Sequence, residues 1–436
     1  MKPPELPASW KWQRLVEVIA KFDAGVSVNG GDRPAMESEY GVLKISAVTE
    51  GNFRPNENKV IEGLEQARAS LNPKRDRLII SRANTPDLIG ANAYIDRDYP
   101  NLFLSDKLWQ LEPREGNELS MRWLGFVLGS TTYRKRMSEI ATGSSQSMKN
   151  ISQESVMQLE LPVPNFTEQQ RIAQLLAEWD TAIEKTEQLI AVTGRHYTHQ
   201  LSRIISQGQH PHSHFGKLAH EVSERNRGGN DARVLSVTNS RGFVLPEDQF
   251  ERRVASADLS NYKVVTRGQY AYNPSRINVG SIARLDDWDM GVLSPMYVVF
   301  GLDEAKVNSD YFLHWLDSHE ARERIKKSAQ GSVRETVSFT EFAAIVFPLP
   351  DLTKQTAIAR YLNALRDEIS TLGVYVEKLK EQKRGLMQKL LTGQGRVPPS
   401  PAPVGHPLPQ AGEGSSDTVS DSPRPLAGEG PGERAR

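Results

Sequence analysis

The chain has 436 residues, 54 basic and 54 acidic side chains, and a formal net charge of zero. This length predicts about two to four domains, each large enough to bury a core. The chain contains no cysteine, which excludes disulfides and every thiolate metal site. Because the first residues lack the apolar core of a signal peptide and no run approaches the ~18 apolar residues that span a bilayer, we expect a cytoplasmic protein without membrane contact.

The chain repeats itself at an offset of 186 residues. Segments 161–190 and 347–376 share a Pro-x-Pro followed by Thr, Gln, Ile-Ala, Leu and Ile at matching places. Just upstream, four residues of each half match at an offset of 188: Arg134, Arg136, Gly143 and Ser144 with Arg322, Arg324, Gly331 and Ser332. A period this long indicates a duplicated domain, because solenoid repeats run about 20–50 residues.

A long helix is predicted after each Pro-x-Pro. Thr167 and Thr353 are the expected N-caps, and Gly208 and Gly393 the expected ends. Apolar positions step alternately by four and three residues, which is typical of a heptad seam. The seam residues are Ile172, Leu176, Trp179, Ile183, Ile190, Ile358, Leu362, Leu365, Ile369, Leu372 and Leu379. Since both copies keep the same register, we expect the two helices to pair with each other, antiparallel.

The regions before the two helices are expected to fold as mixed α/β domains. Strand patterns include 77–81 and 269–273, while 121–137 and 309–325 each read as one amphipathic helix. After Gly395 the chain becomes rich in Pro, Gly, Ser and charge, which is typical of disorder.

We therefore predict an α+β protein with two α/β domains in pseudo-two-fold duplication, separated by two long helices that pair as an antiparallel coiled coil. The predicted parts are 1–164 (first domain), 165–208 (first helix), 209–350 (second domain), 351–395 (second helix) and 396–436 (disordered tail).

Three patterns that could carry chemistry are better explained without it. Residues 273–276 resemble the Asn-Pro-Pro-aromatic box of amino-methyltransferases, but arginine stands in the aromatic position. Residues 350–383 match the loose spacing of a magnesium nuclease, but its Glu and Lys fall inside the heptad helix. The three alternating histidines of 209–216 are interpreted as a polar linker rather than a metal site. We predict no catalytic residue, metal site or cofactor in this chain.

Basic residues cluster at equivalent places in both halves, near loops of Gly and Ser. Such loops offer backbone N–H, hydroxyl and amide groups beside positive charge, the groups that hold phosphates and read base edges. The DNA-binding candidates are Lys74, Arg75, Arg77, Arg82, Arg134, Arg136, Ser144, Ser145, Gln146, Lys149, Arg276, Arg322, Arg324, Lys327, Ser332 and Arg334.

With these motifs, residues 1–396 resemble the specificity subunits of type I restriction-modification systems. The resemblance rests on the alternation of variable region and helix, and on the motif P-x-P-x-x-T-x-Q-x-x-I-A…L…D…I of 162–183 and 348–369. In the second copy Arg366 stands where the first has Asp180.

The resemblance implies two target-recognition domains, each reading half of a split, asymmetric site in double-stranded DNA, with the helices as spacer. It also implies docking of two methyltransferase subunits, and of restriction subunits in the full complex. S-adenosylmethionine, ATP and Mg²⁺ would then be used by those partners. The alternatives are a recognition subunit of another DNA-defence complex, a free-standing DNA adenine methyltransferase or nuclease, and a coiled-coil protein whose domains bind protein.

Overall fold

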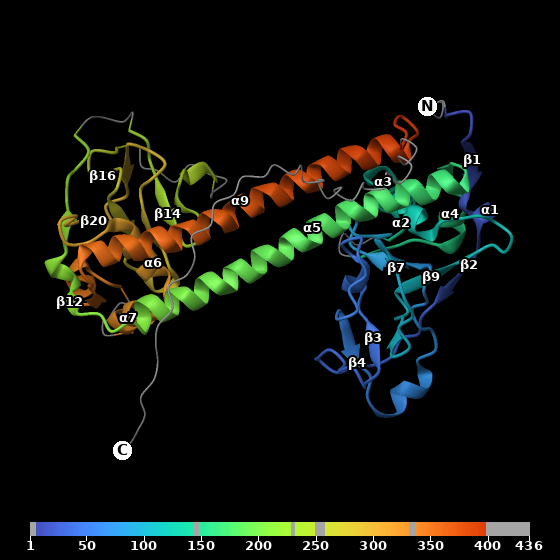
Figure 1. Cartoon of the computed structure of the whole chain (residues 1–436), viewed down its shortest axis with the longest axis horizontal. Helices are drawn as coiled ribbons and strands as arrows, with labels where there is room; N and C mark the ends of the chain where they lie inside the picture. Colours follow the sequence, from blue (N-terminus) through green and yellow to red (C-terminus); the bar gives the residue numbers. More distant parts are fainter. Residues whose placement is uncertain (1–5, 144–147, 228–231, 249–257, 331–335, 398–436) are drawn as a thin grey trace, which may run out of the picture.

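The computed structural model of the protein describes residues 6–143, 148–227, 232–248, 258–330 and 336–397. Two globular domains lie at opposite ends of a pair of long helices, α5 (Phe166–Leu201) and α9 (Leu352–Leu391) (Figure 1). The predicted α+β architecture with two domains and an antiparallel helix pair is confirmed. Of the predicted tail, residues 398–436 lie outside the described part of the chain.

The first domain is built on an antiparallel sheet of order β2-β9-β5-β7. A smaller sheet, β4-β3-β8, and the two-stranded pairs β1-β11 and β6-β10 surround it. Its elements are β1 (Lys11–Arg14), α1 (Leu15–Val18), β2 (Ile19–Ala24), β3 (Gly41–Leu43), β4 (Asn58–Val60), β5 (Arg77–Ser81), β6 (Ala83–Asn84), β7 (Asn92–Ile95), β8 (Leu102–Phe103), β9 (Leu108–Pro113), α2 (Met121–Gly129), α3 (Thr131–Ile140), β10 (Lys149–Asn150), α4 (Gln153–Met157) and β11 (Glu160–Val163).

The second domain repeats this plan around the sheet β13-β20-β17-β18. The pairs β12-β21, β14-β15 and β16-β19 complete it. Its elements are β12 (His212–His214), β13 (Ala219–Val222), β14 (Ser236–Thr238), β15 (Gly242–Val244), β16 (Lys263–Thr266), β17 (Tyr270–Tyr272), the 3₁₀ turn η6 (Ile277–Val279), β18 (Ile282–Arg284), β19 (Met290–Leu293), β20 (Val298–Leu302), α6 (Ser309–Asp317), α7 (His319–Gln330), α8 (Phe339–Ala343) and β21 (Val346–Pro348).

The prediction of one continuous amphipathic helix is wrong in the same way in both halves. Each expected amphipathic helix is divided, into α2 and α3 and into α6 and α7, because Ser130 and Ser318 are extended, with ψ 152° in both. The predicted polar linker is also wrong, since it contains strand β12, which pairs with β21. Alternating histidines are compatible with an edge strand, because every second side chain can face solvent.

The predicted N-caps, Thr167 and Thr353, are wrong as well. Asn165 caps α5 and Asp351 caps α9, each accepting a hydrogen bond from the backbone N–H three residues on, at 3.0 and 2.9 Å. Asn and Asp directly after proline can start a helix earlier than a threonine two positions later. Gly393, with φ +76°, ends α9 as expected, while α5 continues through a π turn over Ser202–Ser206.

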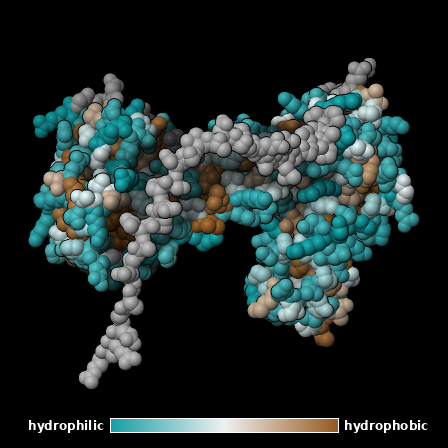
Figure 2. Space-filling model, viewed as in Figure 1, coloured by the Kyte–Doolittle hydropathy of each residue, from teal (hydrophilic) through white to brown (hydrophobic). Residues whose placement is uncertain are grey.

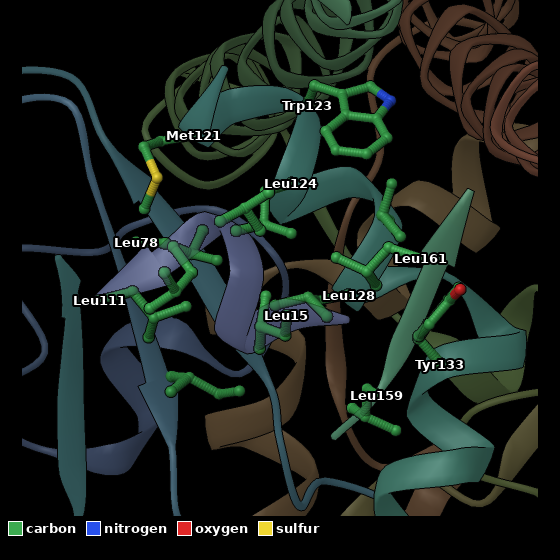
Figure 3. Packing of buried hydrophobic residues seen from close by; sticks show 14 of the residues in the cluster. Leu15, Leu78, Leu111, Met121, Trp123, Leu124, Leu128, Tyr133, Leu159 and Leu161 are labelled. Carbon is green, nitrogen blue, oxygen red and sulfur yellow. The ribbon is translucent and has the colours of Figure 1, made fainter. Parts of the chain in front are cut away.

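The core of each domain includes the ends of both long helices. In the first domain, Leu15, Trp123 and Leu161 come from different elements and converge beneath the helices (Figure 3). Ile172 and Leu176 of α5 and Leu390 of α9 belong to the same buried cluster. In the second domain the core includes Ile358 and Leu362 of α9, which are equivalent to Ile172 and Leu176, together with Leu201 of α5 and Ile205 of the π turn that follows α5. Each domain is therefore rigidly attached to both helices.

The long helices run antiparallel, as their side-chain contacts show. Asp180 pairs with Lys383, Glu187 with Lys380 at 2.8 Å, and His196 with Tyr361 at 3.2 Å, so partner numbers fall on α9 as they rise on α5. Between the domains Leu379 is buried, and the other predicted seam residues are half-buried: Trp179, Ile183, Ile190, Leu365, Ile369 and Leu372. The outermost ones, Ile172, Leu176, Ile358 and Leu362, pack mainly in the domain cores.

A buried histidine joins the second domain to both helices. His314 on α6 is inaccessible to solvent and hydrogen-bonds Asn363 at 2.8 Å and the Tyr197 hydroxyl at 3.0 Å. Burial, with the nearby Arg366 guanidinium, lowers the pKa of His314 to about 4, although Asp317 and Asp310 oppose the shift. The imidazole is thus neutral in the folded state at neutral pH.

This depressed pKa predicts a loss of stability in acid. Because the unfolded chain binds the proton near pH 6.5 while the folded chain resists it until about pH 4, stability falls between these values, by roughly 3 kcal/mol for such a shift. Phe126 occupies the equivalent position in the first domain. Replacing His314 by the same residue type, His314→Phe, should therefore remove this part of the pH dependence. Denaturant unfolding from pH 7 to pH 4 measures it, and equal pH slopes for both proteins would contradict the assignment.

Candidate nucleic-acid interface

The predicted basic residues of the first domain separate into two groups at opposite ends of β5. Arg75 and Arg77 lie where the strand begins, and Arg82 directly follows its end. A five-residue strand spans roughly 16 Å, so the groups are distinct. Arg77 ion-pairs with Glu112 at 2.7 Å and Arg75 with Asp76 at 3.5 Å, whereas Lys74 is exposed.

The second group brings together residues far apart in sequence. The Arg82 carbonyl accepts the Ile151 backbone N–H at 3.0 Å, and Lys149 pairs with Asn84 across β10 and β6. From α3, Arg134 reaches the same region and donates to the Asp87 carbonyl at 2.8 Å. Arg82, Arg134 and Lys149, which we call the first basic cluster, therefore lie on neighbouring segments near Gly143, although the Arg82 Nε already donates to the Asp106 carbonyl at 2.7 Å.

Arg134 stands out because its positive charge is incompletely matched. Its Nη1 is buried and has no hydrogen-bond partner among the residues that the structure describes. Burial lowers the pKa of the guanidinium, and the one hydrogen bond that its side chain makes to the described residues goes to a neutral carbonyl. No carboxylate among the described residues neutralises this charge, and a guanidinium in this state favours a nearby anion such as a phosphate.

The second domain places basic residues at the equivalent site. The Val337 N–H donates to the Pro274 carbonyl at 3.0 Å, as Ile151 does to Arg82. Arg276 follows on the turn before η6 and is exposed. Arg322 of α7 is exposed and lines a cavity of about 430 Å³ with Ile277 of η6. Arg276 and Arg322 form what we call the second basic cluster.

The remaining candidates differ in whether their side chains are exposed or already engaged in contacts within the chain. Arg136 lies 5.0 Å from the Tyr133 ring centroid and donates to the Glu160 carbonyl, and Arg324 ion-pairs with Glu320 at 2.7 Å. Lys327 is exposed. Ser144, Ser145, Gln146, Ser332 and Arg334 lie outside the described residues. Asn84 was not among the predicted residues, because its pairing with Lys149 depends on a strand pair of only two residues.

The described residues contain neither a cluster of metal-ligating side chains nor a helix that could cross a membrane. Among them, no group of three or more His, Asp or Glu side chains could hold a metal ion. In the same described part, no helix is long and apolar enough to cross a membrane. The structure thus presents two domains on a helical spacer, each with basic residues beside a strand end, an arrangement typical of proteins that recognise two separated sites.

Comparison with known proteins shows which class of protein this chain is similar to. Residues 8–193 match the family described as "Type I restriction modification DNA specificity domain". The chain is 21% identical over 420 residues to the putative type I restriction enzyme MjaX specificity subunit of Methanocaldococcus jannaschii, covering 90% of this chain and 95% of that protein. It is 27% identical over 164 residues to the EcoEI specificity subunit of Escherichia coli, covering 37% of this chain and 27% of that subunit's length.

Solved structures agree on the fold. The specificity subunit from M. genitalium superposes with a TM-score of 0.56 at 15% identity, covering 90% of this chain and 99% of that one. A chain from a study of the assembly of a type I system gives a TM-score of 0.52 at 14% identity, covering 90% of this chain and all of that one. Residues 8–193 thus match the DNA specificity domain of type I restriction-modification systems, and the whole chain is similar to specificity subunits of such systems in sequence and in fold.

Proposed function

We propose that this chain is a specificity subunit and that each of its domains reads one half of a split, asymmetric DNA site in the major groove. The observation that carries the proposal is the basic cluster at the same place in both domains, next to a loop of Gly and Ser. Phosphate contacts from such clusters orient a protein on the duplex, and base contacts from the neighbouring loops supply the sequence information.

The helix pair supports a fixed spacing between the half-sites. α9 has 40 residues, which corresponds to a rod of roughly 60 Å. Two recognition domains about 34 Å apart would contact the same face of B-DNA at positions separated by one helical turn. The helix pair is long enough to hold the domains at this distance. Since both helices join both cores, the two domains hold one relative orientation.

We propose that the protein acts in the cytoplasm and that the helix pair docks two methyltransferase subunits, with restriction subunits added in the full complex. Most of the visible surface of both domains is hydrophilic, while apolar side chains show between the domains (Figure 2). Leu189, Val192, Val374 and Tyr375 are exposed on the middle of the helices, and exposed apolar groups gathered this way favour a protein partner. Adenine N6-methylation with S-adenosylmethionine, and cleavage with ATP and Mg²⁺, would belong to those subunits.

Mapping N6-methyladenine across a genome tests this function. The chain is co-expressed with its neighbouring methyltransferase gene, and a strain lacking the chain serves as control. We expect a new split methylation motif that is absent from the control strain. Methylation by the purified chain alone would instead identify a free-standing methyltransferase, and no motif would favour another defence complex.

Arg134→Ala should weaken the binding of all DNA sequences about equally. Loss of one phosphate contact lowers the slope of log K against log salt by about 0.9. Fluorescence anisotropy at several salt concentrations, with the specific site and with random DNA, measures this slope. Arg171→Ala, the same charge change at an exposed position of α5, should leave the slope nearly unchanged. An effect of Arg134→Ala on the specific site alone would make it a base contact.

A further inference from the structure

The pairing of α5 with α9 raises a question of partner choice, because the two half-chains are copies. Apolar residues at equivalent positions hardly differ: Ile172 and Leu176 correspond to Ile358 and Leu362. At the far ends, Ile205 corresponds to Leu391, and both are buried in a domain core. These apolar contacts would serve a pair of identical halves as well as they serve the native pair.

The charged contacts, in contrast, are not equivalent. Lys383 of α9 pairs with Asp180 of α5, with its Nζ 5.2 Å from the centroid of the Phe126 ring. Their side chains are only 17% and 22% exposed. At the other end of the helix pair, the corresponding positions hold Tyr197 and Arg366, and Arg366 donates to the Tyr197 hydroxyl at 3.0 Å. One end thus has an ion pair and the other a cation facing a phenol.

Pairing between two C-terminal halves would bring the wrong residues together. In such a pair Lys383 of each copy would lack its partner Asp180 and would face Arg366 of the other copy. Because the helices are antiparallel, this contact between two cations would occur at both ends of the pair. Asp317, the carboxylate beside Arg366, already accepts hydrogen bonds from Arg366 and Tyr197. One carboxylate would then have to serve two cations in a half-buried setting, where an uncompensated charge is strongly unfavourable.

Pairing between two N-terminal halves loses ion pairs without gaining others. Asp180 would face Tyr197, which supplies a hydroxyl but no positive charge. Glu187, which pairs with Lys380 at 2.8 Å in the native structure, would face Gly194, because that glycine corresponds to Lys380. Both alternatives to the native pair are therefore electrostatically poorer.

We propose that the charged residues of the helix pair make it selective, so that the C-terminal half accepts an N-terminal half and rejects a second copy of itself. Lys383 and Arg366 carry this selection. The same surface would also accept the N-terminal half of another copy of the chain. The inference depends on the helix contacts alone and is independent of DNA binding.

The test uses the whole protein with a protease site inserted after the exposed Gln207, between the π turn and β12. After cleavage, the halves are separated in denaturant, rejoined by dilution and weighed by native mass spectrometry. We expect pairs of unlike halves to exceed pairs of two C-terminal halves by roughly tenfold or more. Equal amounts of the two kinds of pair would overturn the proposal.

Two variants identify the residues responsible. R366L with K383L removes both cations and should raise pairs of C-terminal halves toward the level of unlike pairs. K380A, which breaks the more exposed pairs with Glu187 and Glu377, serves as control and should leave pairs of C-terminal halves rare. In the intact, uncleaved chain, D180K should lower the melting temperature and K383D should restore it. A failure of K383D to rescue would contradict the role of this contact.

Discussion

A heptad inserted into both long helices is expected to lengthen the preferred gap between half-sites by about three base pairs, since seven residues add about 10.5 Å and a base pair rises 3.4 Å. The insertions follow Ile190 in α5 and Leu372 in α9. Both positions lie between the Glu187–Lys380 and His196–Tyr361 contacts, so the contacts on either side can form as before. A whole heptad also preserves the seam.

The measurement is a selection from DNA carrying both half-sites with a randomised gap, or mapping of the methylated motif in cells. The control inserts the heptad into α5 alone, which displaces one end of α5 from its α9 partners and should destabilise the protein rather than create a new spacing. A matched pair of insertions that leaves the preferred gap unchanged would contradict the spacer function of the helices.

Leu176→Ala is expected to cost about 2–5 kcal/mol of unfolding free energy. Leu176 is fully buried in the cluster that joins α5 to the first domain, where Trp123 and Leu390 also pack. Truncation leaves a cavity at the place where the domain is attached to the spacer. Urea unfolding, followed by tryptophan fluorescence, measures the loss.

Leu189→Ala provides a matched control on the same helix. Leu189 is 46% exposed between the domains, so the same substitution should change stability by no more than about 0.5 kcal/mol. Equal effects at the two positions would mean that the helix is not anchored through the core of the first domain.

The division of the chain into two similar halves was predictable from the sequence, because a duplicated motif leaves matching residues at a constant offset. The heptad seam was also readable, since the spacing of apolar residues reports which face of a helix is covered. Ile183 and Ile369, predicted for that face, are half-buried between the domains. Strand β5 was predicted with its observed bounds, because an apolar run between charged ends is typical of a buried strand.

Local breaks and caps were less predictable. Ser130 and Ser318 divide helices whose apolar pattern continues across the break, because a single extended residue changes direction without changing hydrophobicity. The choice of Asn165 over Thr167 as N-cap likewise depends on which backbone conformation the preceding proline and the following packing allow.

The amino-acid pattern was enough for the duplication, the two long helices and the resemblance to a family, since these depend on composition and spacing along the chain. Only the tertiary structure separated Arg82, Arg134 and Lys149 from Arg75 and Arg77, because strand pairing decides which side chains meet. It also determined that Lys383 faces Asp180, while Arg366 faces Tyr197 and Asp317. Contacts between distant residues depend on how helices and sheets pack, and a single sequence records that packing only indirectly.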